Sequence, residues 1–258
     1  MQSYSRWLVV ALVLTLSLPA VVRAQNGDQD DARNAAQNLV KQHEAWERTS
    51  TPGAYVRLKL AGRDGPVVRY NIFVTGLPAD QLYSLVSWPV TEPQPITLYE
   101  GVSLGKNGLV MCTGRRDGEC KDPSDPSDPD FGIVDLTIQP AKGEPFRLAV
   151  VRGDQRAAAV IVPIPINTKD KQCILDAVRL TPHFELTYLT GSGYPPNTEI
   201  LFDSESLGEK RTVKTHADAD GHVRFAVLPF VEGHAHGTTK IRAVDISCSP
   251  ALQFDWGR

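Results

Sequence analysis

The sequence lacks most of the features from which an activity is usually inferred. It contains no His-Glu-x-x-His, phosphate-loop or dinucleotide-binding motif and no Cys-x-x-Cys pair, and we expect no Gly-x-Ser-x-Gly nucleophile elbow. No common metalloprotease, nucleotide, redox or serine-hydrolase chemistry is therefore indicated. It also lacks an excess of one charge, because the formal net charge is only -3. A nearly neutral chain gives no electrostatic reason to expect nucleic acid or an anionic membrane as a partner. We therefore predict a protein that is not an enzyme and has no nucleic-acid partner.

Long apolar runs are missing beyond the first 24 residues. Within residues 1–24, Arg6 precedes an apolar stretch from Trp7 to Leu18, and Val22-Arg23-Ala24 has the small-residue pattern of a cleavage site. This order is typical of a secretory signal peptide, and the stretch is shorter than the roughly 20 residues of a membrane span. We expect an exported protein, periplasmic or secreted, with no membrane span after cleavage. An uncleaved anchor is the alternative.

Cysteine is scarce, with only Cys112, Cys120, Cys173 and Cys248. An even number of cysteines in an exported chain predicts two disulfides, for which three pairings are possible. We favour Cys112–Cys120 and Cys173–Cys248, because each pair then lies within one of two repeated segments. All four cysteines are predicted to be structural.

Glycine and proline, in contrast, are plentiful, with 20 and 19 residues, which favours a turn-rich β protein. Short blocks recur along the chain in the same order. The matched blocks are 74–80 with 191–197, 130–140 with 219–229, and 146–150 with 240–244. The middle pair has a glycine followed by apolar residues at every second position, which is the period of a β-strand. The repetition predicts two copies of one β-domain.

The second copy carries a family resemblance. With its regularly spaced strands, the segment Gly191-Ser192-Gly193-Tyr194-Pro195-Pro196-Asn197 and the hairpin Asp218-Ala219-Asp220-Gly221 resemble bacterial immunoglobulin-like β-sandwich domains in tandem. The resemblance implies an adhesion, spacer or ligand-binding module of an exported protein. The chain lacks the Cys–Trp–Cys core of antibody domains, so no immune-type function is implied.

We expect an all-β fold of two immunoglobulin-like β-sandwich domains preceded by one short N-terminal helix. The domains span 54–166 and 167–258, with the proline-containing stretch 163–169 as a stiff linker. The N-terminal segment 25–53 holds a helix from Asp30 to about Arg48, because apolar residues follow a three-to-four spacing. These residues are Ala32, Ala36, Leu39, Val40, His43 and Trp46. The helix either packs on the first domain through Leu39 and Trp46 or serves as a tether or partner-binding helix.

The two copies differ by a long insertion, 114–132, where the second copy has only the turn 218–221. Six carboxylates occupy this insertion, namely Asp117, Glu119, Asp122, Asp125, Asp128 and Asp130. Calcium binds six to eight oxygens, several from carboxylates, so the insertion is a candidate calcium site, although no EF-hand pattern is present. The alternative is a solvated acidic loop that mutual repulsion keeps extended. Either form is compatible with a loop that contacts a partner.

Histidine offers a candidate zinc site composed of His216, His222, His234 and His236. Residues two apart on a strand face the same side of a sheet, so His234 and His236 can share a metal ion. The glycines on either side of this pair, Gly233 and Gly237, indicate a loop instead.

Exposed aromatic rings can bind sugars, and the candidate rings are Tyr83, Trp88, Tyr99, Tyr194 and Trp256. Burial in the core is the alternative for these rings. From the whole sequence we predict an exported, non-enzymatic binding or scaffolding protein whose protein or glycan partner is unknown. The alternative function is a carbohydrate-recognition module of the cell envelope or of an extracellular polysaccharide. Beyond calcium, no cofactor is predicted.

Overall fold

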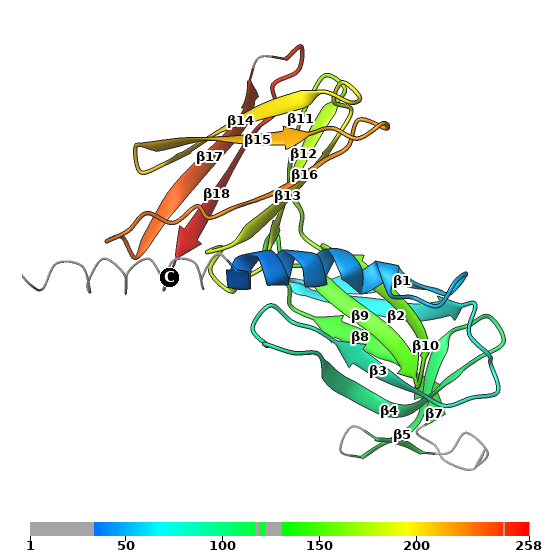
Figure 1. Cartoon of the computed structure of the whole chain (residues 1–258). Helices are drawn as coiled ribbons and strands as arrows, with labels where there is room; N and C mark the ends of the chain where they lie inside the picture. The colour runs from blue at the N-terminus through cyan, green and yellow to red at the C-terminus, as the bar shows by residue number, and fades with distance from the viewer. Residues whose placement is uncertain (1–33, 117–118, 122–130, 245, 258) are drawn as a thin grey trace, which may run out of the picture. The chain divides into compact units, whose positions relative to one another are not determined.

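The computed structural model describes residues 34–116, 119–121, 131–244 and 246–257. The predicted signal peptide, 1–24, lies outside the described residues. The described chain is all-β with a single helix, residues 34–48 (Figure 1). This confirms the predicted fold class of a β protein preceded by one short N-terminal helix.

The first half of the chain forms two sheets around one hydrophobic core. One sheet has the order β1 (Tyr55–Asp64), β2 (Val67–Thr75), β8 (Asp135–Ile138), and the other begins with β10 (Gln155–Ile161), β9 (Phe146–Arg152), β3 (Tyr83–Ser87) and β4 (Ile96–Leu104). Ile72 from the first sheet and Leu85 and Leu148 from the second are fully buried in the shared core. Apolar residues at alternate positions therefore join these sheets as a β-sandwich.

The predicted insertion extends the second of these sheets. Beyond β4, the sheet continues through β6 (Glu119–Lys121), β5 (Val110–Arg116) and β7 (Phe131–Ile133). Leu109 forms a bridge with Phe73 of β2, and the amide of Val134 donates to the carbonyl of Val110 at 3.1 Å. The insertion thus leaves the strand after Val110 and returns to it at Val134.

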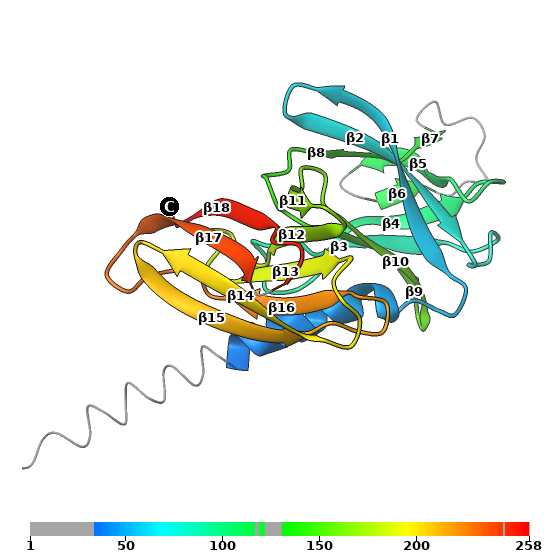
Figure 2. The same ribbon diagram turned by 90° about the horizontal axis from the view of Figure 1, so that it is seen from above.

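The second half of the chain forms another sandwich (Figure 2). One sheet has the order β11 (Ile166–Asp170), β12 (Cys173–Arg179), β13 (Thr187–Ser192), β16 (Val223–Val227), and the other has the order β15 (Glu209–His216), β14 (Glu199–Ser206), β17 (His236–Val244), β18 (Ala251–Gly257). Leu175, Leu189, Phe202 and Ile241 are fully buried in its core, two from each sheet. Because β11 begins at Ile166, which is itself buried, half of the predicted linker 163–169 is a strand of this sandwich.

The two sandwiches share one strand order. The order β1-β2-β8 corresponds to β12-β13-β16, and β10-β9-β3-β4 corresponds to β18-β17-β14-β15. The turn before β16 also has a counterpart: Gly221 donates to the carbonyl of Asp218, and Gly108 donates likewise to the carbonyl of Gly105. The counterpart of the turn 218–221 is therefore 105–108. The sequence comparison matched the insertion with the turn 218–221, and this match was wrong. The insertion instead interrupts the strand that follows the turn 105–108.

A disulfide joins Cys173 of β12 to Cys248, just before β18, with the Cα atoms 5.9 Å apart. The predicted pair Cys173–Cys248 is therefore confirmed. Cys112 is also disulfide-bonded, but the side chain of Cys120 lies outside the described residues, so the pair Cys112–Cys120 stays a prediction.

Residues Val40–Arg258 form one compact unit, in which the sandwiches are bonded to each other. The amide of Arg179 in β12 donates to the carbonyl of Gly143, in the loop between β8 and β9, at 2.8 Å. The guanidinium of Arg179 also forms an ion pair with Glu144 at 3.3 Å. The two sandwiches are therefore joined by direct bonds as well as by the chain that links them. The domain boundaries 54–166 and 167–258 stay a prediction.

The C-terminal end of the helix covers the outer edge of β10. Three alternate amides of β10 donate to side-chain oxygens from the helix end, at 2.7 to 3.0 Å. The pairs are Arg156 with Thr51, Ala158 with Ser50, and Val160 with Glu47. An open edge strand is a template for pairing with other chains, and covering it is a known protection. The predicted packing of Trp46 on the first sandwich is also confirmed, since its indole nitrogen donates to the carbonyl of Leu148 at 3.2 Å.

Candidate functional site

The predicted calcium ligands are not placed by the structure. Asp117, Asp122, Asp125, Asp128 and Asp130 lie outside the described residues, and so does the side chain of Glu119. The calcium site in the insertion 114–132 therefore stays a prediction.

The predicted zinc ligands are spread over separate elements. His216 ends β15, His236 begins β17, and His234 and His222 lie in loops. In the described part of the chain, the one group of three possible metal ligands is Asp218, Asp220 and His222, all exposed. It contains one of the four predicted histidines.

The group around Asp218 has a local structural explanation. Its Oδ1 accepts hydrogen bonds from the amides of His222, at 2.8 Å, and Asp220, at 3.0 Å. These bonds stabilise the charged carboxylate, the one from His222 most, and lower its pKa. The carboxylate is thus used to close the tight turn before β16, as aspartate commonly does.

The pattern Gly-x-Ser-x-Gly does occur in the chain, at Gly101-Val102-Ser103-Leu104-Gly105, so the expectation that this pattern is absent was wrong. In α/β-hydrolases this pattern marks a nucleophile on a turn between a strand and a helix. Here the serine lies within β4, where it pairs with Met111 of β5. The structural context that the motif requires is therefore absent at this position.

Most of the aromatic rings considered for sugar binding belong to the cores. Tyr83, Trp88, Tyr194 and Trp256 are all buried, and Tyr99 is half-buried. Polar atoms of three rings bond internally: Tyr83 to the carbonyl of Pro78, Trp88 to that of Glu92, and Trp256 to the hydroxyl of Ser206. Core burial, the alternative for these rings, is confirmed for the four buried ones.

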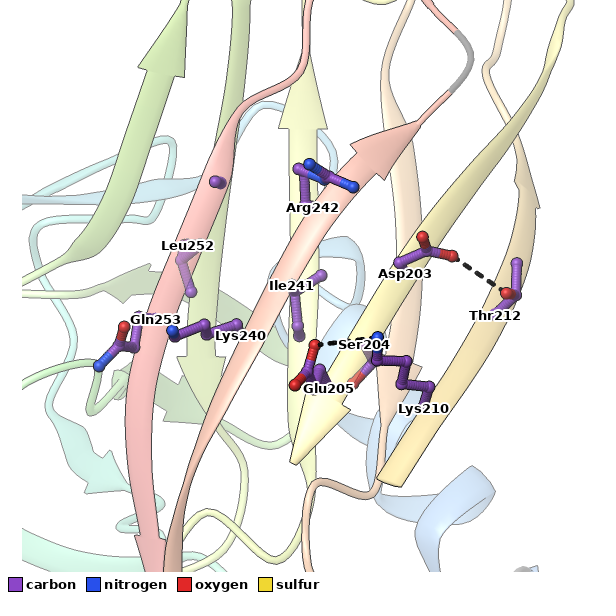
Figure 3. Close-up of a pocket in the computed structure, with 11 residues that line it drawn as sticks. Asp203, Ser204, Glu205, Lys210, Thr212, Lys240, Ile241, Arg242, Leu252 and Gln253 are labelled. Carbon is purple, nitrogen blue, oxygen red and sulfur yellow. Dashed lines mark hydrogen bonds and ion pairs between the residues drawn. The ribbon is translucent and has the colours of Figure 1, made fainter. Parts of the chain in front are cut away.

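A hollow with a volume of about 600 Å³ lies on the outer face of the sheet β15-β14-β17-β18 (Figure 3). We name it the sheet-face groove. Alternation along each strand places polar side chains outward, while Ile241 and Leu252 point into the core. The polar lining comprises Asp203 and Glu205 of β14, Lys210 and Thr212 of β15, Lys240 and Arg242 of β17, and Gln253 of β18.

The charges of the sheet-face groove are only partly paired. Lys210 lies 3.8 Å from Glu205, and the Thr212 hydroxyl donates to Asp203 at 3.0 Å. Lys240 and Arg242, two apart on the central strand β17, make no ion pair within the described residues. The face thus offers two free cations beside two carboxylates and an amide, which suits hydrogen bonding to an extended polar ligand. Sequence reasoning missed this site, because Lys-Ile-Arg alternation is typical of any solvent-facing strand.

The most strongly shifted pKa values belong to buried groups outside the groove. Burial, and next the charge of Arg147, lower the pKa of His43 to about 3. Burial, and next a hydrogen bond to Glu44, raise the pKa of Tyr188, whose hydroxyl lies 2.6 Å from that carboxylate. These two shifts arise where the helix packs against the sandwiches. Burial also lowers the pKa of Arg147 to about 10, and burial, and next the charge of Asp176, raise the pKa of Tyr194 in the core of the second sandwich.

No helix in the described part of the chain has both the length and the apolar character needed to cross a membrane. No protein-family model matches the sequence, and no curated protein matches it either.

Proposed function

We propose that this chain is an exported, non-enzymatic binding or scaffolding protein of two immunoglobulin-like modules, whose sheet-face groove holds an extended polar ligand. The observation that carries the proposal is the pair of unpaired cations, Lys240 and Arg242, on the central strand of that groove. Carboxylates on one neighbouring strand and Gln253 on the other supply further hydrogen-bonding groups to such a ligand. Sites of this kind select ligands by hydrogen bonds and charge rather than by ring stacking.

The common strand order of the two sandwiches supports the assignment of repeated immunoglobulin-like modules. The bonds from Arg179 to the loop around Gly143 and from Tyr188 to Glu44 support a scaffolding role, because they hold the two modules and the helix from Val40 onward in one compact unit. The disulfide Cys173–Cys248 supports export, since such bonds persist in oxidising compartments.

Two observations bear on the other functions. His43 and Tyr188, two of the groups with strongly shifted pKa values, owe their shifts to packing of the helix, so these shifts do not require a catalytic role. No observation supports carbohydrate recognition by stacking on the five candidate rings, because four of them are buried.

The test is a charge reversal with a matched control. The variant Lys240→Glu/Arg242→Glu changes the groove, and Lys59→Glu/Arg63→Glu makes the same change in charge on exposed positions of β1. Binding of the processed chain to a panel of purified envelope polysaccharides and exported proteins is measured by biolayer interferometry. We expect a ligand that the wild type and the control retain and that the groove variant binds at least about tenfold more weakly. Equal binding by all three proteins, or no ligand for the wild type, contradicts the proposal.

A further inference from the structure

A second hollow, of about 420 Å³, lies between the helix, the loop from β3 to β4, and β10. We name it the tryptophan groove. The indoles of Trp46 and Trp88 line it together with Pro93 and Pro95, and their ring centroids lie 5.7 Å apart. Gln42 and Gln94 are exposed beside it. A mostly apolar hollow of this size with a few polar groups is the usual form of a small-molecule site.

The two indole nitrogens are already occupied. Trp46 donates to the carbonyl of Leu148 at 3.2 Å and Trp88 to that of Glu92 at 3.0 Å. The two indoles are themselves almost fully buried, at 6% and 4% exposure, and offer no free hydrogen-bond donor. Any polar recognition in the tryptophan groove therefore falls to other side chains.

Arg156 is the charged residue that lines the tryptophan groove. Its guanidinium lies 4.3 Å from the centroid of the Trp46 ring, and its Nη2 makes one long hydrogen bond, 3.5 Å, to the Trp46 carbonyl. Its Nε is buried without a hydrogen-bond partner, and no carboxylate of the described residues forms an ion pair with it. A partly buried cation without a counter-ion is costly, and an incoming anion relieves that cost.

A second arginine, Arg147, lies against the Trp88 ring and forms no ion pair with a described carboxylate. Arg147 is almost fully buried and lies with its guanidinium 4.5 Å from the Trp88 ring centroid. It donates to Nδ1 of His43 and to the Trp88 carbonyl, while its Nη2 is buried without a partner. Neither acceptor carries a negative charge. Each ring of the Trp46–Trp88 pair therefore lies against a guanidinium that forms no ion pair with a described carboxylate, although the charge of Glu144 acts on Arg147 from a longer distance.

We propose that the tryptophan groove binds a small ligand that carries one carboxylate next to an apolar body. The carboxylate pairs with the guanidinium of Arg156, whose planar fork matches a carboxylate with two parallel hydrogen bonds. The apolar body packs on the apolar lining of the groove, to which the exposed Pro93 and Pro95 contribute. Because Arg156 is the one charged residue that lines this mostly apolar groove, the groove suits a monoanion. A phosphate dianion needs more hydrogen-bond donors and more positive charge. This site is separate from the sheet-face groove and does not depend on it.

The experiment uses the full processed chain and three probes: 3-phenylpropionate, its uncharged amide, and a short peptide that ends in Pro-Leu with a free carboxylate. The first two test the need for charge, and the peptide distinguishes a free acid from a chain terminus as the source. Binding is followed by tryptophan fluorescence and by calorimetry. We expect at least one carboxylate probe to bind and the amide to bind at least about tenfold more weakly.

Two variants and one control locate the site. Arg156→Gln removes the charge and should weaken carboxylate binding at least about tenfold, whereas Arg152→Gln, at an exposed arginine of β9, should leave it unchanged. Gln94→Trp fills the mouth of the groove from an exposed loop and leaves Arg156 in place, so it should also abolish binding even if Arg156→Gln perturbs folding. Binding of the amide as tight as that of the acid, or unchanged binding in Gln94→Trp, overturns the proposal. So does the absence of binding by the wild type at millimolar probe.

Discussion

The Nε of Arg147 donates a hydrogen bond of 3.0 Å to Nδ1 of His43, so the partner of the most deeply buried arginine is a neutral imidazole and not a carboxylate. The bond joins β9 to the helix across 104 positions of sequence. Protonation of His43 removes the acceptor and places a second positive charge beside the first. The attachment of the helix is therefore sensitive to acid.

The first prediction is a loss of stability in mild acid. His43 has an ordinary pKa of 6.5 when unfolded and about 3 when folded, so the unfolded chain takes up a proton first. The free energy of unfolding should therefore fall as the pH drops from about 6.5 towards 3, by at most about 1.4 kcal/mol per pH unit. The other groups at His43 are the Tyr188 ring, the Arg147 guanidinium and the neighbouring Glu44.

Urea unfolding between pH 7.5 and 4.5 measures this effect. The matched variant is His43→Asn, which keeps an acceptor near Nδ1 but does not titrate. Carboxylates elsewhere contribute equally to both proteins, so the difference between the two curves isolates His43. Parallel curves for wild type and variant would show that His43 does not control the acid sensitivity.

The second prediction concerns the bond that ties the helix to the second sandwich. Tyr188 donates to Oε1 of Glu44 at 2.6 Å, and removal of a hydrogen bond to a charged group costs about 1.5 to 3 kcal/mol. Tyr188→Phe should lower the free energy of unfolding by that amount. Tyr70→Phe, at a half-buried ring packed on the first core, should change it by less than about 0.5 kcal/mol. A double-mutant cycle with Glu44→Gln that shows no coupling energy would mean that the Tyr188–Glu44 hydrogen bond does not stabilise the fold.

The third prediction concerns the covered edge of β10. Ser50→Ala/Thr51→Val removes the side-chain acceptors of the Arg156 and Ala158 amides but leaves Glu47 on Val160. Hydrogen exchange of the first two amides should speed up by about tenfold or more, which corresponds to one lost bond each. The Val160 amide is the internal control. Uniform acceleration at all three amides would indicate that the helix undocks as a whole.

The fourth prediction compares two glycines with positive φ. A Cβ at Gly221 would clash with the Tyr194 carbonyl oxygen, whereas a Cβ at Gly208 meets nothing within 4 Å. Gly208→Ala therefore costs only the backbone strain, about 1 kcal/mol. Gly221→Ala should cost about 3 kcal/mol or more, because the hairpin must also move. Thermal unfolding of the two variants measures the difference, and equal costs would mean that the turn adapts freely.

The fifth prediction concerns the confirmed disulfide. Cys173→Ala/Cys248→Ala opens a loop of 75 positions and should lower the free energy of unfolding by about 2 to 4 kcal/mol. Urea unfolding of the oxidised wild type and the variant gives the value. Addition of reductant should then have no further effect on the variant through this bond.

Local patterns predicted the architecture because they report directly on strands and turns. The alternation in 219–229 is seen as β16 with Val223 and Val227 buried, and the spacing of His43 and Trp46 is seen as the buried side of the helix. Cysteine number and position predicted the pair Cys173–Cys248. These signals depend on residues a few positions apart or on one covalent bond.

The sites depend on contacts that local patterns do not encode. Arg147 lies between Phe146 and Leu148 in a strand that reads as half solvent-facing, and its burial is explained by contacts with the distant residues His43 and Trp88. The sequence comparison also matched the insertion, and not the turn 105–108, with the turn 218–221. The strand that the insertion interrupts cannot be recognised from sequence, because its parts at Val110 and Val134 meet only in the folded chain. Arg156 reads as an ordinary edge-strand arginine until the helix is placed over it.

The helix end that covers β10 also sets an order of events during synthesis. Its partners lie more than 100 positions later in the chain, at Leu148, Ala158 and Val160, so the helix emerges long before anything exists for it to dock on. Isolated helices of this length are marginal in water, and closing so long a loop costs entropy before any contact compensates it. The helix is therefore among the last elements of the first sandwich to become structured, although it is the first of them to be synthesised.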